Sequence, residues 1–252
     1  MFNPEYYIGT IDYYRQLFNR LPYVTLGSHS SKQIIRAKIN DGNRYREVFE
    51  GSKNWDKYYE IVRQRELYAA EIARLEKEFN EIYKVTYRRL LPLYRIEGRV
   101  RHKYDKDFWD NIPDEQNTYE KNNNYYFDGI QFGSRAEVLI ATVLKKLGLK
   151  YRYDVRIRAN RNKYFVDFVV YLPQFGCCFL IEFFGRLNDK EYLDDVLTKT
   201  YDYYKEKIFP GQDIIFLGGD MNNMPSEDVI AEQIMAMVNS IAMQHVVRKQ
   251  AA

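Results

Sequence analysis

The chain has few of the residues that usually bind zinc or support catalysis by a histidine base. It contains 252 residues but only two cysteines and three histidines. Cys177 and Cys178 are adjacent in a predicted buried strand, where neighbouring side chains point to opposite faces, so we expect core residues and not a disulfide or a zinc site. His29, His102 and His245 are scattered, and none has a Cys or His partner at ligand spacing. The same scatter weakens a Ser-His-Asp or Cys-His site, although partners in such sites need not be close in sequence.

A targeting segment and a large excess of one charge are also absent. The first ten residues, MFNPEYYIGT, lack a basic region followed by an apolar core, and no uninterrupted apolar run is long enough to span a bilayer. We therefore expect a cytoplasmic protein with no membrane partner. The formal net charge of +3 is too small to indicate a polyanion partner by itself.

Two apolar runs in the C-terminal half predict the centre of the fold. Phe165–Leu172 and Cys177–Phe184 are rich in Val, Phe, Ile and Tyr, and a Pro-Gln-Phe-Gly turn separates them. Each predicted strand contains one acid, Asp167 or Glu182, and a carboxylate is costly in hydrocarbon unless it is paired, hydrogen-bonded or bound to a metal. Antiparallel pairing about the turn could bring both acids to one edge of the sheet. Two oxygen donors held close together suit a hard cation such as Mg²⁺.

The N-terminal half predicts a helix followed by a hairpin. Apolar residues recur at roughly helical spacing in the first twenty positions and stop before Pro22. Gln33–Ile39 and Arg44–Phe49 flank a turn with an Asp-Gly step, which favours a hairpin. Arg36 and Lys38 make one face of this hairpin basic. That face contacts either nucleic acid or only water, and we favour water.

A long helix is predicted from Trp55 to about Tyr87, where the chain has no Gly or Pro. Apolar residues recur there at nearly heptad spacing: Ile61, Tyr68, Ile72, Leu75, Phe79 and Ile82. This seam must be covered either by another helix of the same chain, which is the commoner outcome, or by a second copy in a homodimer.

The polar segment Asn111–Asn124 predicts a linker, so we place a module boundary near Tyr126. The N-terminal module then covers residues 1–125 and the C-terminal module covers residues 126–252. The C-terminal module should begin with a helix at Ser134 that Gly148 ends. We expect its buried stripe to be Val138, Leu139, Thr142, Val143 and Leu147.

Later elements of this module are a helix at about 189–205, a strand at 213–217 and a helix at about 226–246. The last helix has an apolar face made by Val229, Ile230, Ile234, Met237, Val238 and Ile241. Glu137 lies three residues after Ser134, the spacing of a capping box, which alone gives it an adequate structural role.

A block of basic residues precedes Asp167. Between positions 145 and 163 there are eight basic residues and one acid: Lys145, Lys146, Lys150, Arg152, Arg156, Arg158, Arg161 and Lys163 against Asp154. Such a block could neutralise phosphates, with Arg156, Arg158, Arg161 and Lys163 as candidate DNA contacts. The alternative is a solvated edge of a helix and a strand, because charge runs usually face water.

The order of these elements resembles the PD-(D/E)XK nuclease superfamily, which has the restriction-endonuclease-like fold. More narrowly, it is similar to a bacterial and phage branch in which the second acid is followed by an aromatic residue and glycine. The resemblance covers about residues 127–217. It rests on Ser134–Glu137, Val166–Phe168, Ile181–Gly185, Tyr192, Lys199, Tyr203 and Ile208–Gly211. It implies an α/β fold with a mixed sheet flanked by helices, preceded by the hairpin and long-helix module.

The resemblance also implies a Mg²⁺-dependent nuclease acting on DNA, with Mn²⁺ as a substitute metal. Asp167 and Glu182 correspond to metal ligands, and the backbone carbonyl of Phe183 corresponds to a third donor. Glu137 corresponds to a ligand of a second metal or of a metal-bound water. Mg²⁺ held by two carboxylates can polarise a phosphate and acidify its bound water.

The chain departs from the superfamily pattern two residues after Glu182, where Phe184 stands in place of a lysine. We expect Lys199 to replace that lysine. Tyr192, Val196, Lys199 and Tyr203 form one stripe of the next helix, whose apolar members would face the sheet. The alternative is that Lys199 extends past Val196 to water.

Three other interpretations are compatible with the sequence. The acids could be structural. The chain could be a non-catalytic DNA-binding or assembly protein that retains the nuclease fold, with the long helix mediating dimerisation. An RNA-binding module is a weaker alternative, suggested by 24 tyrosines that could stack on bases, although core and amphipathic surface positions explain most of them better.

Overall fold

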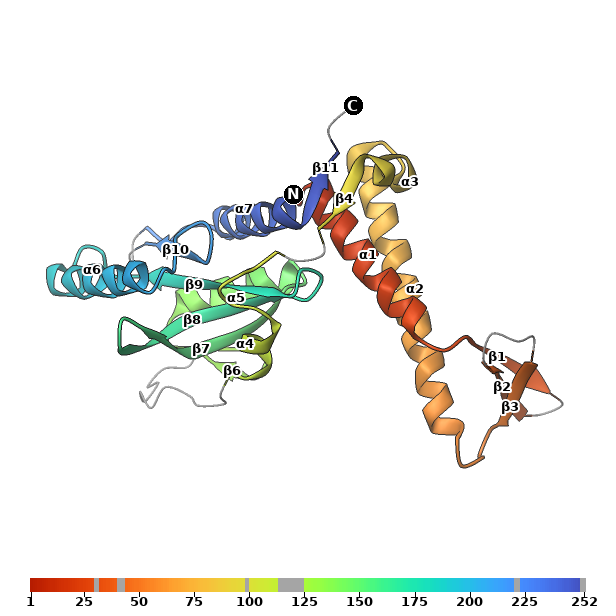
Figure 1. Ribbon diagram of the computed structural model, residues 1–252. Helices are drawn as coiled ribbons and strands as arrows, with labels where there is room; N and C mark the ends of the chain where they lie inside the picture. The colour runs from red at the N-terminus through yellow and green to blue at the C-terminus, as the bar shows by residue number, and fades with distance from the viewer. Residues whose placement is uncertain (30–31, 40–43, 98–99, 113–124, 220–222, 250–252) are drawn as a thin grey trace. The chain divides into compact units, whose positions relative to one another are not determined.

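The computed structural model describes residues 1–29, 32–39, 44–97, 100–112, 125–219 and 223–249 (Figure 1). The chain forms two compact units. The N-terminal unit comprises Pro4–Arg95 with Arg248–Ala252, and the C-terminal unit comprises Met1–Asn3 with Ile96–Val247. The chain passes between them at strands β4 (Tyr94–Ile96) and β11 (Val246–Arg248). Helices and strands are both abundant, so the protein belongs to the mixed α/β class.

The division between the units lies earlier in the chain than the predicted boundary near Tyr126. Tyr104 and Ile112 are both buried in the core of the C-terminal unit, with Phe108 packed against them. The segment before the predicted linker therefore belongs to the sheet that follows it. Most of the linker itself, residues 113–124, lies outside the described residues.

The N-terminal unit contains the predicted helix, hairpin and long helix. Its elements are α1 (Pro4–Arg20), β1 (Val24–His29), β2 (Lys32–Ile39), β3 (Arg44–Phe49), α2 (Trp55–Tyr83), α3 (Tyr87–Leu90) and the 3₁₀ turn Leu91–Leu93. Strands β2 and β3 pair antiparallel with Ile39 opposite Arg44, which confirms the predicted hairpin. Strand β1 was not predicted, because its sequence VTLGSH lacks a clear alternation. It pairs antiparallel with β2.

The three-stranded sheet buries one face against the beginning of α2. Ile35, Ala37 and Val48 of the sheet form a core cluster with Val62 of α2. Arg36 is exposed on the opposite side and pairs with the exposed Glu47 at 3.2 Å between Nε and Oε1. The basic face of the hairpin is therefore exposed.

The apolar seam of α2 is covered by α1 of the same chain. Leu75 and Phe79 of the seam are 2% and 0% exposed, and Tyr7 and Ile11 of α1 are equally buried. The rings of Tyr7 and Phe79 meet edge to face with their centroids 5.8 Å apart. These contacts cover the seam within one chain, as in the first of the two predicted alternatives.

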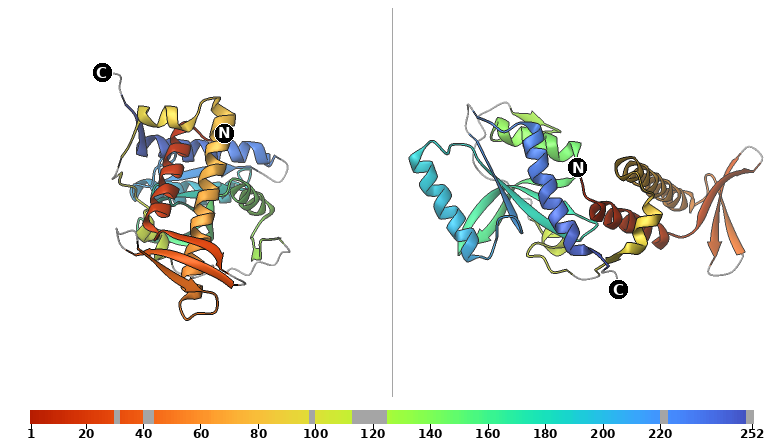
Figure 2. Two further views of the ribbon diagram at one scale, coloured as in Figure 1. Left: turned by 90° about the vertical axis from the view of Figure 1, so that its right-hand side faces the viewer. Right: turned by 90° about the horizontal axis from the view of Figure 1, so that it is seen from above.

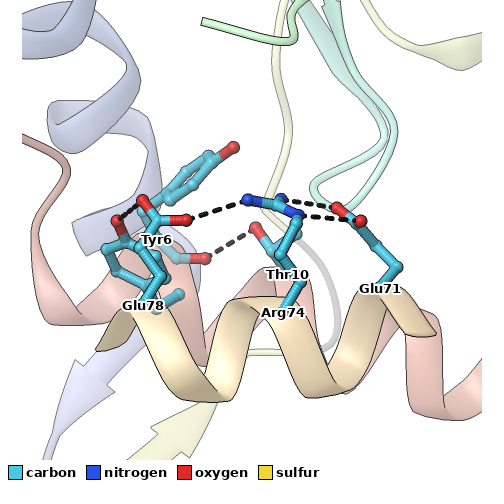
Figure 3. Close-up of polar contacts among 6 residues, drawn as sticks. Tyr6, Thr10, Glu71, Arg74 and Glu78 are labelled. Atoms are coloured by element: carbon cyan, nitrogen blue, oxygen red, sulfur yellow. Dashed lines mark hydrogen bonds and ion pairs between the residues drawn. The ribbon is translucent and has the colours of Figure 1, made fainter. Parts of the chain in front are cut away.

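Polar contacts fix α1 on α2 beside this apolar layer (Figure 3). The Tyr7 hydroxyl donates a hydrogen bond of 2.5 Å to Glu78, whose other oxygen pairs with Arg74 at 2.9 Å. Arg74 also donates to Glu71. Within α1, the Thr10 hydroxyl donates to the carbonyl of Tyr6 at 2.7 Å. The ion pairs of α2 therefore extend across to α1 through one tyrosine.

Leu75→Ala should destabilise the N-terminal unit by about 2–5 kcal/mol, the usual cost of truncating a fully buried leucine. Leu67→Ala on the same helix is the control, because Leu67 is 64% exposed and its loss should change little. Urea unfolding followed by circular dichroism measures both variants. A result in which Leu75→Ala dissociates a dimer without changing stability would show that the seam is intermolecular.

The C-terminal unit is built on a four-stranded mixed sheet. Its elements after β4 are α4 (Lys106–Asp110), β5 (Tyr126–Phe127), β6 (Ile130–Gln131), α5 (Arg135–Lys146), β7 (Lys150–Ala159), β8 (Asn162–Leu172), β9 (Cys177–Phe184), α6 (Lys190–Lys205), β10 (Ile214–Gly218) and α7 (Glu227–His245). The strand order is β10-β9-β8-β7. Strands β7, β8 and β9 pair antiparallel in sequence, and β10 returns parallel to β9 after α6.

Helices cover both faces of this sheet. On one face, Cys178 and Leu180 of β9 join Tyr104 and Tyr203 in a single core cluster, which brings in the α4 segment and α6. On the other face, α7 brings His245 to Cys177. Helices α5 and α7 pack against each other, and Figures 1 and 2 show them side by side.

The ends of α5 agree with the sequence, but its buried face does not. Ser134 caps the first turn and Gly148 follows the helix with φ of +68°, as expected. The buried residues are Ala136, Ile140, Ala141, Val143 and Leu144, so only Val143 of the predicted stripe is correct. Two small alanines allow close approach of neighbouring elements on a face that bulk alone does not identify. On α7, Val229 is likewise 43% exposed although it was predicted to be buried.

No helix in the described ranges combines the length and the hydropathy needed to cross a membrane.

Candidate active site

The register of β8 and β9 places Asp167 and Glu182 opposite each other. Backbone pairing runs from Leu172 opposite Cys177 to Phe168 opposite Ile181. One step further along the two strands are Asp167 and Glu182, where this ladder ends. There the Phe183 amide donates to Asp167 Oδ2 at 2.6 Å. The acids therefore meet at one end of the paired region, as pairing about the turn predicts.

At Asp167 the regular alternation of β8 side chains between the two faces of the sheet is interrupted. Residues three apart in a regular strand point to opposite faces, yet Val166 and Val169 belong to the same core cluster. On the neighbouring strand, Asp154 lies level with Asp167 and has a positive φ of 59°. The two strands thus bend together at this level. The bend leaves Asp167 half-buried between residues that are fully buried.

Glu182 is a buried carboxylate with a cation beside it. It is 4% exposed, and the Lys199 ammonium donates to its Oε1. Lys199 also donates to the carbonyl of Phe165 at 3.0 Å. The Tyr203 hydroxyl donates to Oε2 at 3.3 Å. A carboxylate on β9 and an ammonium on α6 therefore form an ion pair beside Phe165, in the interior of β8.

The predicted stripe of α6 faces the sheet. Val196 and Tyr203 are buried, and Lys199 extends between them to Glu182. Lys205 is exposed and lies over the ring of Tyr201, with its ammonium 5.2 Å from the ring centroid. Lys199 is therefore the α6 lysine that reaches the acids, and it does not extend to water.

Phe184 contributes packing at the position where the superfamily pattern has lysine. Its side chain is 8% exposed and lies against the ring of Phe216, with centroids 5.2 Å apart. The preceding ring of Phe183 lies over Gly185, where an added Cβ would be 2.9 Å from a ring carbon. The residues Phe183, Phe184 and Gly185 thus pack closely, and this packing excludes a long polar side chain at position 184.

Glu137 is held at the beginning of α5 by four hydrogen bonds to three residues. Its amide donates to Ser134 Oγ at 3.2 Å, the capping interaction that the sequence predicts. Its carboxylate accepts from Ser134 Oγ at 3.0 Å, from the Gly133 amide at 2.8 Å and from the Tyr153 hydroxyl. This network positions the carboxylate on a rigid helix terminus. Capping accounts for part of it, and the Tyr153 contact extends it toward the sheet.

The three carboxylates form one electrostatic group. Burial raises the pKa of Asp167 well above its usual value, and the charges of Glu182 and Glu137 raise it further. The Phe183 amide and Lys199 oppose this shift. Burial also raises the pKa of Glu182, against the lowering effect of Lys199 and Tyr203. Burial and mutual repulsion therefore disfavour the charged forms of these acids, and a cation placed beside them would favour those forms.

The candidate DNA contacts lie at the hairpin that joins β7 to β8. Arg158 pairs across the hairpin with Lys163, and Arg161 lies in its turn with φ of +71°. All three are exposed. Arg156 and Arg158 also border a hollow of 350 Å³ that includes Lys103 and Tyr104. The cationic groups are therefore accessible to a polyanion.

Asp202 of α6 anchors this basic hairpin. Its carboxylate accepts from the side chains of Asn160 at 2.7 Å, Asn162 at 2.6 Å and Tyr164 at 2.5 Å. These hydrogen bonds, that of Tyr164 first, lower the pKa of Asp202. The asparagine side chains thus tie the turn to the same helix that carries Lys199.

Replacing Asp202 with asparagine should reduce stability in a pH-dependent way. A lowered folded-state pKa stabilises the protein above the unfolded value of about 3.9, and this stabilisation is lost as pH falls through the folded value. The difference in stability between wild type and Asp202→Asn should be complete at neutral pH and shrink below about pH 4. Urea unfolding across this range measures it, with the exposed Asp195→Asn as control. A pH-independent difference would assign the effect to packing.

No family model, curated protein or solved structure matches the chain. The interpretation of the site therefore rests on its own geometry.

The sequence missed one cluster of metal-binding side chains. Among the described residues, the one group of three Asp, Glu, His or Cys side chains whose ligand atoms all lie within 4.8 Å of one another is His102, Cys177 and His245. The histidines have no Cys or His partner at ligand spacing in the sequence, but His102 and His245 lie beside the buried Cys177 in the structure. Residues far apart in sequence meet through the fold. One signal was present, since His245 continues the buried Ile234, Val238 and Ile241 stripe of α7.

Proposed function

We propose that the C-terminal unit is a metal-dependent nuclease of the restriction-endonuclease-like fold that hydrolyses phosphodiester bonds in DNA. The observation that supports it best is the convergence of Asp167, Glu182 and Lys199 from β8, β9 and α6. The mixed sheet, with an antiparallel meander and a parallel strand after a helix, is compatible with that fold. An ion pair alone is a weaker explanation, because it does not account for the half-buried Asp167 next to two other acids.

The donor set fits Mg²⁺. Asp167 and Glu182 offer carboxylate oxygens at one sheet end, which are the ligands a hard cation prefers. Burial raises both pKa values, and the charges of Glu182 and Glu137 add to the shift of Asp167; a divalent cation would oppose both effects. Asp167 and Glu182 would hold the ion, with the carbonyl of Phe183 as a further donor. The bound ion would supply Lewis-acid polarisation of the phosphate and a more acidic water.

The chain's own residues would perform the remaining tasks. Lys199 lies beside Glu182 and can keep that carboxylate ionised while its ammonium stabilises negative charge that develops on the phosphate. The Tyr203 hydroxyl donates to the other carboxylate oxygen of Glu182 and so orients that side chain. Glu137, fixed by Tyr153 and Gly133, can hold a water or a second ion at the start of α5. The exposed arginines of the β7–β8 hairpin would bind the phosphate backbone.

The proposal is tested by incubating purified protein with plasmid, linear duplex and single-stranded DNA, with and without Mg²⁺ or Mn²⁺. Cleavage that requires the metal and disappears with EDTA supports it. Asp167→Asn protein purified in parallel reveals any contaminating nuclease. If wild type and this variant cleave equally, or if neither cleaves any substrate with either metal, the enzymatic proposal fails.

Replacing Arg156, Arg158, Arg161 and Lys163 with glutamine should flatten the dependence of log affinity on log salt. Each lost phosphate contact removes a slope of about 0.9 on duplex DNA. Fluorescence anisotropy in the Asp167→Asn background measures binding without cleavage. The matched control is Lys145→Gln with Lys146→Gln, since Asp128 and Glu227 already pair with these lysines. An unchanged slope would assign the four residues to a solvated edge.

A second candidate is a non-catalytic DNA-binding protein that retains the fold. It is favoured by Phe184 at the usual lysine position and by Lys199 and Tyr203 occupying both oxygens of Glu182. The two candidates differ in one outcome. A DNA-binding protein binds with a salt-dependent affinity and leaves the DNA intact with Mg²⁺ and with Mn²⁺.

A further inference from the structure

The His102, Cys177 and His245 side chains come from three separate segments of the C-terminal unit. His102 lies between β4 and α4, Cys177 is the first residue of β9, and His245 is the last residue of α7. Their ligand atoms all lie within 4.8 Å of one another. The Nε2 atoms of the two histidines are 2.8 Å apart, and the rings are nearly parallel. Two imidazole nitrogens and a thiol thus converge on one point.

This point is shielded from water. Cys177 is 0% exposed and His245 is 6% exposed. The ring of Phe175 stacks on His245 with centroids 4.9 Å apart. Burial lowers the pKa of His245 to about 4 and also lowers that of His102.

The cluster is distinct from the acids of the proposed active site. Cys177 begins β9, whereas Glu182 lies five residues further along the same strand. At about 3.3 Å per residue the two positions are roughly 17 Å apart. Cys177 and Glu182 also point to opposite faces, because the even-numbered Cys178 and Leu180 belong to the face that contains Tyr203. One ion cannot serve both groups.

We propose that His102, Cys177 and His245 bind a zinc ion. Imidazole and thiolate donors select borderline-soft metals such as Zn²⁺ over Mg²⁺. Tetrahedral coordination with Zn–N of about 2.1 Å and Zn–S of about 2.3 Å separates the ligand atoms by about 3.3–3.6 Å. This separation lies between the 2.8 Å of the histidine pair and the 4.8 Å limit of the cluster, so small side-chain rotations suffice. Cys177 binds as the thiolate and releases its proton to solvent.

The ion would act as a structural clamp. It would add a metal bridge from the end of α7 to the start of β9 and to the segment before α4, where Cys178 already donates a backbone hydrogen bond to the Tyr104 carbonyl. Asp213, a buried acid that acts electrostatically on His102, adds negative charge near the cation. This proposal does not depend on nuclease activity.

The test is the zinc content and the metal-dependent stability of the full chain. Wild-type protein, purified without chelators, should contain one equivalent of zinc by mass spectrometry. Replacement by Co²⁺ should give ligand-field bands and a sulfur-to-cobalt charge-transfer band. A chelator should lower the melting temperature, and Zn²⁺ should restore it where Mg²⁺ does not.

Cys178→Ser is the matched control for Cys177→Ser. The two cysteines are adjacent and both buried, but Cys178 faces the cluster that contains Leu180 and Tyr203. Cys177→Ser should weaken zinc binding by about 100-fold or more and lose the charge-transfer band. Cys178→Ser should keep both. His102→Asn tests the site at a partly exposed position outside helices and strands, which separates loss of zinc from any effect of a buried serine on folding.

Two results would overturn the proposal. The first is wild-type protein that holds no zinc above background and shows no cobalt spectrum. The second is zinc binding that Cys177→Ser and His102→Asn leave unchanged. Either result would mean that the histidines form only a hydrogen-bonded pair beside a core thiol.

Discussion

Asp167→Asn and Glu182→Gln are each expected to lower DNA cleavage on the order of 10³-fold with Mg²⁺. Each change removes one anionic oxygen ligand from a shared cation but keeps the size of the side chain. The hydrogen bond from the Phe183 amide to position 167 can persist through the asparagine carbonyl oxygen. Initial rates on plasmid DNA measure the effect.

Glu191→Gln is the control for charge, because Glu191 is an exposed acid on α6. It should cleave at the wild-type rate. DNA binding by the two site variants should persist or tighten, since local negative charge is removed next to the phosphates. Near wild-type cleavage by either site variant would show that the proposed metal site is wrong.

Lys199→Met is the second change with a large expected effect, a loss of about 10²–10³-fold in cleavage rate. The methionine keeps much of the side-chain volume beside Val196 and Tyr203 but removes the ammonium from Glu182. Lys205→Met on the same helix should be nearly silent, because Lys205 is exposed and contacts Tyr201. Metal and DNA binding should be retained by both variants. Full activity in Lys199→Met would refute the lysine's proposed role even if both acids are essential.

Loss of Lys199 leaves Glu182 buried without a cation, which could weaken the fold. Urea unfolding of Lys199→Met, with cleavage measured at a temperature where the variant is fully folded, separates the two effects. A loss of cleavage in the folded variant is chemical. Near wild-type cleavage by the folded variant would show that Lys199 acts only by stabilising the fold.

The local pattern of the sequence predicted the elements that carry the acids. The turn between Leu172 and Cys177 determines the register of β8 and β9, so the meeting of Asp167 and Glu182 follows from counting along two strands. The stripe of α6 likewise placed Lys199 toward the sheet, because its neighbours at helical spacing are apolar. Both predictions depend only on residues close together in the sequence, and the structure contains both arrangements.

Features that depend on contacts between residues far apart in the sequence could not be predicted from local patterns. The buried face of α5 was misassigned because small alanines, and not the bulkiest residues, lie against neighbouring elements. The cluster of His102, Cys177 and His245 forms only where three segments meet, and no residue spacing within any one segment predicts it. The predicted boundary between the units lies too late in the chain, because Tyr104 and Ile112 pack on a sheet whose strands come much later in the sequence.

The connectivity of the site has a consequence for the order in which the chain folds. Strands β8 and β9 are joined by a four-residue turn, so their pairing closes a short loop and can occur early. Lys199 reaches Glu182 only after α6 has formed and docked. Two like charges are therefore brought together before the ammonium that neutralises one of them arrives. We expect this repulsion to destabilise the β8–β9 hairpin until α6 docks and brings Lys199 to Glu182. Docking of α6 is therefore expected to be a late step that stabilises the sheet.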